Sequence, residues 1–161
     1  MINLNFVIDN LTKSQASFYL IKELNKRHED ISPIVFVENL APMLLRPSFP
    51  IMQIAELWNH TGTTIATTTA TAFKILNYPG PTRRILYLWD IYWLRGRRRV
   101  YEPYVNLFDD KRLEIIVRSQ SHKRVFENCF NRQVLGVVED FNMEGFLEVL
   151  NPKEALSEAP V

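Results

Sequence analysis

The sequence contains few of the residue types from which metal sites and disulfide frameworks are built. Cys129 is the single cysteine among 161 residues, which excludes an internal disulfide framework and a cysteine-based zinc site. The three histidines, His28, His60 and His122, show no spacing typical of a metal site. We therefore expect no metal, and the lone cysteine favours a reducing, cytoplasmic location.

Net charge and long apolar runs are also scarce. The formal net charge is +1, so no global charge favours nucleic acid or an anionic membrane. No apolar run approaches the roughly 20 residues that a membrane-spanning helix needs. The N-terminus has no basic leader, so we expect no signal peptide and no membrane span. A hydrophobic fraction of 47% with 23% charged residues is typical of a soluble globular domain.

Short apolar runs rich in Val, Ile and Phe recur along the chain, each bounded by polar or turn residues. They are nearly continuous rather than alternating, which is typical of strands covered on both faces. We expect strands at Leu4–Ile8, Pro33–Val37, Pro50–Ala55, Thr63–Thr67, Ile85–Trp89, Leu113–Arg118 and Val134–Asp140.

Helical patterns separate these runs. We expect helices within residues 14–28, 69–80, 102–110, 119–131 and 142–150. Ser14 and Asn142 are the expected caps of the first and last helices. In the first helix Phe18, Ile21 and Leu24 share one face, and in the fourth Val125, Phe126, Cys129 and Phe130 form a stripe. Pro103 is expected in the first turn of the third.

The alternation of strands and helices predicts a Rossmann-like three-layer α/β/α fold. Its sheet is expected to be mostly parallel, with about six or seven strands and right-handed crossovers. Residues 1–150 would form one domain, and residues 151–161 a polar C-terminal tail. In such sheets ligands collect at the carboxyl ends of the strands, so polar residues that follow strands are the candidate site.

Two hydroxyl-rich loops follow strands in the first half of the chain. Asn10, Thr12 and Ser14 lie in a loop without glycine, which disfavours a dinucleotide site of the G-x-G-x-x-G type. This loop could bind phosphate at the helix start, although a simple capping loop is the favoured interpretation. Thr68 and Thr69 could bond a sugar, and helix capping is again favoured.

Two further strand ends carry groups that could move a proton. Trp89 could stack on a sugar while Asp90 acts as a general base; core packing and turn capping are about equally supported. After the next long strand, His122 could act as a base near neutral pH. A structural role is the favoured interpretation of this histidine. The same loop holds anion-binding candidates at Arg118, Ser119 and Ser121.

A basic and aromatic cluster comprises Trp93, Arg95, Arg97, Arg98 and Arg99. It could meet phosphates of nucleic acid. The near-neutral net charge and the acidic residues that follow disfavour that interpretation. A solvated loop or a partner-binding patch is favoured, because Trp and Arg are enriched at interfaces.

The order of several motifs resembles a known family. "NFVIDN", "SFYLIKELN", "YLWDIYWL", "IIVRSQSHKRVFEN" and "VVEDFN" together resemble the N-terminal Rossmann-like half of GT-B glycosyltransferases. They are most similar to short glycosyltransferase-like proteins of tailed phages, including cyanophages. The resemblance covers residues 2 to about 150 and implies a host-cytoplasmic, phage-encoded protein.

The resemblance implies an acceptor-side domain. Its acceptor residues would be Asn10–Ser14, Thr68, Thr69, Asp90 and Arg118–His122. In GT-B enzymes the nucleotide-sugar is held mainly by a C-terminal half, which would begin where this sequence ends. The resemblance thus implies no resident cofactor beyond a nucleotide-sugar donor, and a second protein or second copy that completes the cleft. A non-enzymatic phage binding or assembly module that reuses the fold is the alternative.

Overall fold

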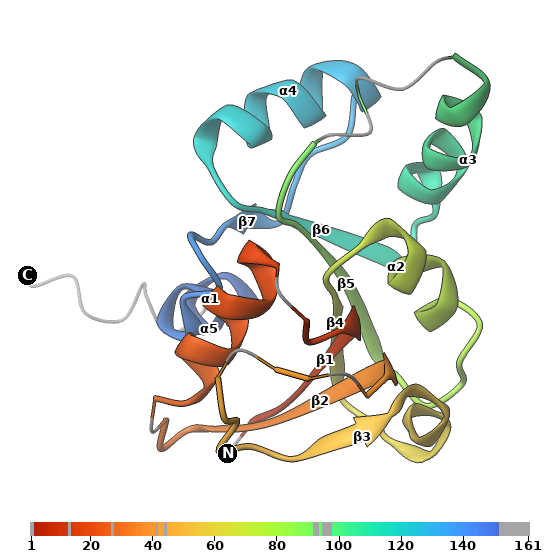
Figure 1. Ribbon diagram of the computed structural model, residues 1–161. Coiled ribbons are helices and arrows are strands. Elements are labelled where there is room, and N and C mark those ends of the chain that lie inside the picture. Colours follow the sequence, from red (N-terminus) through yellow and green to blue (C-terminus); the bar gives the residue numbers. More distant parts are fainter. Residues whose placement is uncertain are drawn as a thin grey trace, which may run out of the picture.

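We describe a computed structural model that covers residues 2–12, 14–26, 28–40, 42–43, 45–91, 94 and 98–151, with the backbone alone for residues 98–101. The chain forms a three-layer α/β/α sandwich around one seven-stranded sheet (Figure 1). All strand pairs are parallel, in the order β3-β2-β1-β4-β5-β6-β7. The predicted Rossmann-like class is confirmed.

All seven predicted strands are present, with shifted ends. They are β1 (Ile2–Asn10), β2 (Ile31–Asn39), β3 (Ile51–Gln53), β4 (Thr63–Ala66), β5 (Arg83–Leu88), β6 (Leu113–Val117) and β7 (Gly136–Val137). The helices are α1 (Gln15–Leu24), η1 (Ile54–Asn59), α2 (Thr69–Ile75), α3 (Arg98–Asp109), α4 (Gln120–Phe130) and α5 (Met143–Leu150). Among the described residues, no helix is long and apolar enough to span a bilayer.

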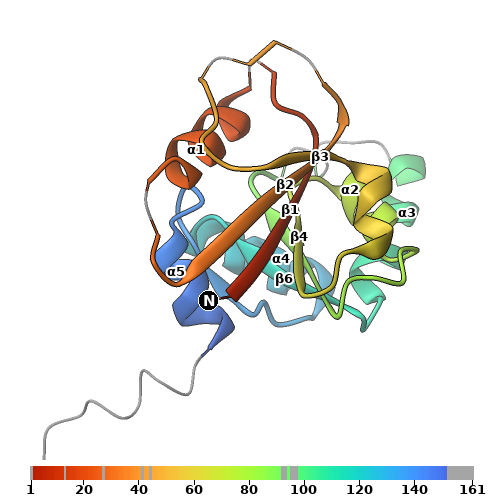
Figure 2. The ribbon, with the colours of Figure 1, turned by 90° about the horizontal axis from the view of Figure 1, so that it is seen from below.

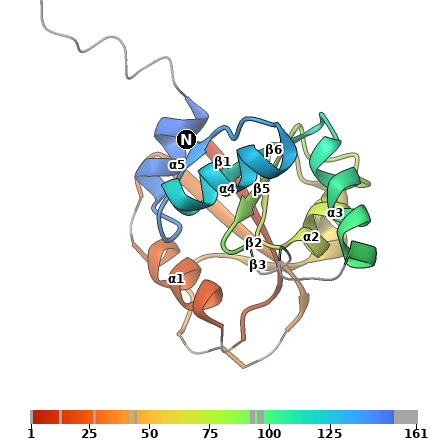
Figure 3. The same cartoon turned by 90° about the horizontal axis from the view of Figure 1, so that it is seen from above.

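The two faces of the sheet carry separate cores. On one face Leu20 of α1 and Phe146 of α5 pack against Phe6 of β1. On the other face η1, α2, α3 and α4 pack together, with Phe108 of α3 edge-on to Phe126 of α4. Figures 2 and 3 show the sheet between these two sets of helices.

The change of covering face fixes where a cleft can form. The chain leaves β1 through α1 toward β2, but leaves β4 through α2 in the opposite direction toward β5. Right-handed crossovers then place α1 and α2 on opposite faces. The carboxyl ends of β1 and β4 lie at this switch point, where the connections diverge.

Helix caps explain where the helices begin. Ser14 Oγ accepts a hydrogen bond from the Ser17 amide at 3.0 Å, and Asn142 Oδ1 accepts one from the Gly145 amide at 2.7 Å. Both predicted caps are confirmed. Thr68 caps α2 through a reciprocal pair of bonds with Thr71, which satisfies amides that the first helical turn leaves unpaired.

Some helical predictions were wrong in detail. Phe18 is 37% exposed, and Leu20 takes its place in the core. In the predicted stripe of α4, Phe126 is fully buried, whereas Cys129 is exposed. α3 begins at Arg98, so Pro103 lies inside the helix rather than in its first turn. The run Pro50–Ala55 forms only a three-residue strand and then continues as η1.

Candidate functional site

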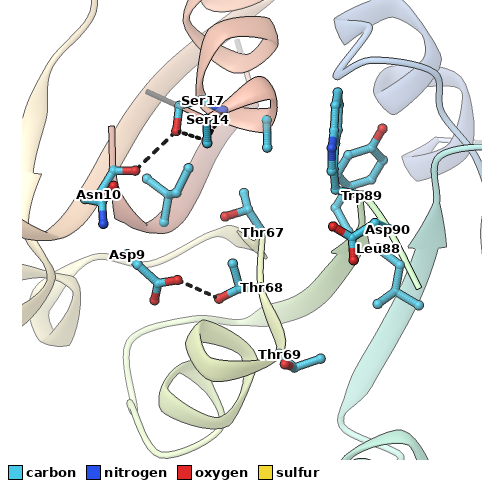
Figure 4. Close-up of a pocket in the computed structure, with 13 residues that line it drawn as sticks. Asp9, Asn10, Ser14, Ser17, Thr67, Thr68, Thr69, Leu88, Trp89 and Asp90 are labelled. Atoms are coloured by element: carbon cyan, nitrogen blue, oxygen red, sulfur yellow. Dashed lines mark hydrogen bonds between the residues drawn. The ribbon is translucent and has the colours of Figure 1, made fainter. Parts of the chain in front are cut away.

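A cleft of about 310 Å³ lies at the switch point, between the carboxyl ends of β1, β4 and β5 (Figure 4). Three strand ends and the starts of α1 and α2 form its walls. The lining residues are Ile8, Asp9, Asn10, Ser14, Ala16, Ser17, Thr67, Thr68, Thr69, Tyr87, Leu88, Trp89 and Asp90. Among the described residues, no lysine, arginine or histidine lines it.

Asp9 and Thr68 join the ends of β1 and β4. Thr68 Oγ1 donates a hydrogen bond to Asp9 Oδ2 at 3.2 Å. The hydroxyl of Thr68 also accepts from the Thr71 amide at 3.1 Å, so the same residue caps α2 and holds the carboxylate. Figure 4 shows Asp9 and Thr68 side by side, across the cleft from Trp89 and Asp90. The prediction that Thr68 caps a helix is confirmed.

The surroundings of Asp9 disfavour its charged form. Burial and the nearby carboxylate of Glu38 raise the pKa of Asp9 above its ordinary value, and burial contributes most. The Thr68 hydrogen bond and the Lys74 ammonium act in the opposite direction but are outweighed. The Lys74 ammonium forms an ion pair with Glu38 Oε1, so Glu38 binds the nearby cation directly.

A chain of hydrogen bonds shapes the β1–α1 loop. Asn10 Oδ1 accepts from the amide of Thr12 at 3.2 Å and also from its hydroxyl. Ser14 and Ser17 share a hydrogen bond of 2.7 Å, and Ser17 Oγ donates to the Asn10 carbonyl at 3.3 Å. These bonds hold the loop in place without any glycine. They leave Asn10 and Ser14 at the cleft while Thr12 lies outside its lining.

Trp89 forms the aromatic wall opposite. It is only 8% exposed, and its ring stacks on Phe141 with centroids 5.2 Å apart and planes at 15°. The guanidinium carbon of Arg118 lies 3.9 Å from the centre of the same ring. Protein groups therefore occupy much of this ring, which favours the packing interpretation. A direct role in ligand binding stays a prediction.

An unusual turn supports this wall. Asp140 and Phe141 both adopt left-handed backbone conformations, with φ of 43° and 62°, which cost free energy for residues other than glycine. The turn brings Asp140 to Arg118, whose Nε lies 2.8 Å and whose Nη2 lies 2.7 Å from Asp140 Oδ1. It also places Phe141 under Trp89. The strained turn thus positions both partners of the Arg118–Trp89 contact.

His122 lies in the first turn of α4, near Leu88 and Asp90 at the end of β5. Ser119 Oγ caps the helix by accepting from the His122 amide at 3.2 Å. Burial and the charge of Arg118 lower the pKa of His122, and the Asp90 carboxylate and the Leu88 carbonyl only partly offset them. Its Nδ1 is buried without a hydrogen bond among the described residues. The ring is therefore mainly neutral at pH 7.

The structure brings together several predicted site residues at one edge. Asn10, Ser14, Thr68, Thr69, Trp89 and Asp90 line the cleft. Arg118 contacts the cleft residue Trp89, and the cleft residue Asp90 acts on His122. Ser119 caps the helix that holds His122. Ser121 is exposed at the start of α4.

The predicted partner-binding cluster cannot be placed in the same way. Trp93, Arg95 and Arg97 lie outside the described residues, and Arg98 and Arg99 are described only as backbone at the start of α3. Their role in partner binding stays a prediction.

Asp9 is the main residue of the cleft that was not predicted from sequence. It follows the apolar run of β1 in the same way that Asp90 follows the run of β5, so the signal that identified Asp90 also marks Asp9. Ser17 and Thr67, which also line the cleft, gave weaker signals, because a small polar residue in a helix or strand has many structural roles.

Metal binding has no evident site in the part of the chain that the structure describes, where no three potential ligands among His, Cys, Asp and Glu lie together. Comparisons with models of protein families, with curated proteins and with solved structures give no match. Functional interpretation of the cleft therefore depends on its geometry and chemistry.

Proposed function

We propose that the cleft binds a sugar through its hydroxyl groups, as the acceptor side of a glycosyltransferase-like domain. The observation that carries this proposal is the composition of the lining. Asp9 and Asp90 supply carboxylates at the ends of β1 and β5, and Asn10, Ser14, Thr67 and Thr68 add amide and hydroxyl groups. Such groups exchange hydrogen bonds with a polyol, and carboxylates are strong acceptors for hydroxyl donors.

The charge of the lining disfavours an anion inside the cleft. A phosphate there would approach two carboxylates, and no cationic side chain among the described lining residues would offset the repulsion. Arg118 lies against the Trp89 ring, outside the lining. We therefore expect a neutral or cationic ligand in the cleft, and place any negative charge of a donor on the Arg118 side.

The expected reaction is the transfer of a sugar to an acceptor hydroxyl. The hydroxyl oxygen would form the new bond to the anomeric carbon of the donor, the bond to the leaving group would break, and the hydroxyl proton would pass to a base. Asp90, which lines the cleft, is the first proposed base. His122, which lies near Asp90 but outside the lining, is the second. Arg118 would stabilise negative charge on the leaving group while it keeps its ion pair with Asp140.

The test is isothermal titration calorimetry with methyl glycosides and nucleotide-sugars at millimolar concentration. We expect at least one methyl glycoside to bind, and Thr68→Val to weaken its binding, because this change removes the hydroxyl that holds Asp9. The matched control is Thr82→Val, an exposed threonine preceding β5 at the opposite edge of the sheet, which should leave binding unchanged. Failure of every glycoside to bind would overturn the proposal.

A further inference from the structure

The carboxylate of Asp9 lies in the cleft, and among the described residues the cation that acts on it is Lys74. Parallel pairing of Ile8 with Val37 and of Asn10 with Asn39 places Asp9 beside Glu38 on the adjacent strand. Like charges on neighbouring strands repel each other. Asp9 is therefore an acidic group at a partly buried position, next to a second acid.

The other groups that face Asp9 compensate it incompletely. Lys74 of α2 forms its ion pair with Glu38, and Asp90 at the end of β5 adds a further acid to the same cleft. Thr68 supplies one neutral hydrogen bond, to Oδ2. No hydrogen bond to Asp9 Oδ1 occurs among the described residues, and Asp9 lines the cleft, so a ligand in the cleft can meet this carboxylate.

We infer that the preferred ligand of the cleft is an amino sugar, whose ammonium group binds the Asp9 carboxylate while its hydroxyls bond the threonine and serine side chains. This inference rests on the proposed function, because it assigns a chemical class to the sugar in the same cleft. The ammonium group of the ligand would pair with Asp9 as the Lys74 ammonium pairs with Glu38. Hydrogen bonds from an ammonium group to a carboxylate are about twice as strong as those between neutral groups.

The size of the cleft is compatible with such a ligand. Ligand pockets commonly measure about 300–1,000 Å³, and this cleft, at about 310 Å³, lies at the small end of that range. It therefore suits one sugar ring. A charge-assisted contact of about 1.4 kcal/mol corresponds to a tenfold change in affinity, so we expect an amine to improve binding by roughly tenfold over a hydroxyl at the same ring position.

The test compares four matched ligands by calorimetry at pH 6.5: glucosamine, glucose, N-acetylglucosamine and glucose 6-phosphate. We expect glucosamine to bind roughly tenfold more tightly than glucose, N-acetylglucosamine to lose that gain because its amide is neutral, and the phosphate to bind most weakly. Asp9→Asn should abolish the preference for the amine. Asp30→Asn, an exposed aspartate just before β2 at the opposite edge, should retain it.

The outcomes separate the two proposals. Equal binding of glucosamine and glucose, or an amine preference that survives Asp9→Asn, would overturn the amino-sugar assignment while leaving sugar binding intact. Absence of binding by all four ligands would overturn both.

The pH profile adds a readout that a merely structural role of Asp9 would not change. The amine preference should fall as pH drops through the pKa of Asp9, because protonation removes its charge. A ratio of affinities that stays constant as Asp9 becomes protonated would contradict the assignment.

Discussion

Two carboxylates at the same edge of the sheet, Asp9 and Asp140, have different partners within the protein. Asp140 is bound by the guanidinium of Arg118, which also lies against Trp89. Among the described residues, Asp9 has one hydrogen-bond partner, the Thr68 hydroxyl, and an acidic neighbour, Glu38, and its pKa is raised. One side of the edge is thus closed by partners within the protein, whereas the other leaves an incompletely compensated carboxylate in a cleft.

This difference indicates which side of the sheet edge can contribute free energy to ligand binding. The closed side is held by aromatic packing and an ion pair, at the cost of two left-handed residues, Asp140 and Phe141. The open side is held by helix-capping bonds that leave its polar groups accessible. A ligand gains more from the second side, because pairing an undercompensated charge is favourable while displacing the Arg118–Asp140 pair is not.

Truncation of a side chain on the closed side should lower the stability of the protein more than truncation on the open side. Phe141 is fully buried and packs on Trp89 and Tyr87, so Phe141→Ala should lower the free energy of unfolding by about 3–5 kcal/mol. Urea denaturation measures this loss. The control is Phe73→Ala, which removes a phenylalanine that is 39% exposed on α2 and should cost much less. Equal losses would contradict the packing described for this wall.

A smaller effect is expected from a single buried hydrogen bond. The Tyr87 hydroxyl donates to the Val138 carbonyl at 2.7 Å, and burial raises the pKa of this phenol, so it stays protonated. Tyr87→Phe should lower the free energy of unfolding by about 1–2 kcal/mol, because the carbonyl loses its partner. Thermal unfolding at two pH values would measure it. An unchanged stability would show that the hydroxyl contributes nothing here.

The open side should respond in the opposite direction. Because the folded-state pKa of Asp9 is raised, the folded protein retains this proton to higher pH than the unfolded chain does, and stability falls as pH rises through this window. Asp9→Asn should therefore be more stable than the wild type at pH 7. The advantage should shrink as pH falls through the raised folded-state pKa of Asp9 and should disappear below the ordinary value of 3.8, as measured by denaturation across pH. A variant less stable at pH 7 would contradict this sign.

The weakest effect concerns His122. Its pKa is lowered below the ordinary value of 6.5, so the unfolded chain takes up this proton first as pH falls, and the folded state loses stability below about that pH. Over that pH window, the free energy of unfolding should fall less steeply for His122→Gln than for the wild type. Denaturation of both proteins between pH 7 and pH 5 measures the difference. Parallel curves would contradict the lowered pKa.

Much of the fold could be predicted because the relevant signals are local in sequence. Continuous apolar runs identified all seven strands, and Ser14 and Asn142 identified two helix starts. The rule that parallel strands end at one edge then brought Thr68 and Asp90 to the same cleft. β3 was overestimated, because the apolar run after Pro50 also suits η1, whose Leu57 is buried.

The rest depended on contacts between distant segments. The pKa of Asp9 depends on Glu38, which strand register brings beside it from another strand. The packing of Trp89 depends on Phe141, placed by a turn whose left-handed residues are not glycines. The sequence alone shows neither the register nor these backbone angles.

The most direct test of the central claim is a two-dimensional amide NMR titration of the ¹⁵N-labelled protein with methyl β-glucoside and with glucosamine. We predict saturable shifts for Asn10, Ser17, Thr68 and Asp90 around the cleft, larger with glucosamine, and none for Asp30 or Thr82 at the opposite edge. Shifts confined to other surfaces, or no shifts with either sugar, would contradict the assignment of this cleft as a sugar-binding site.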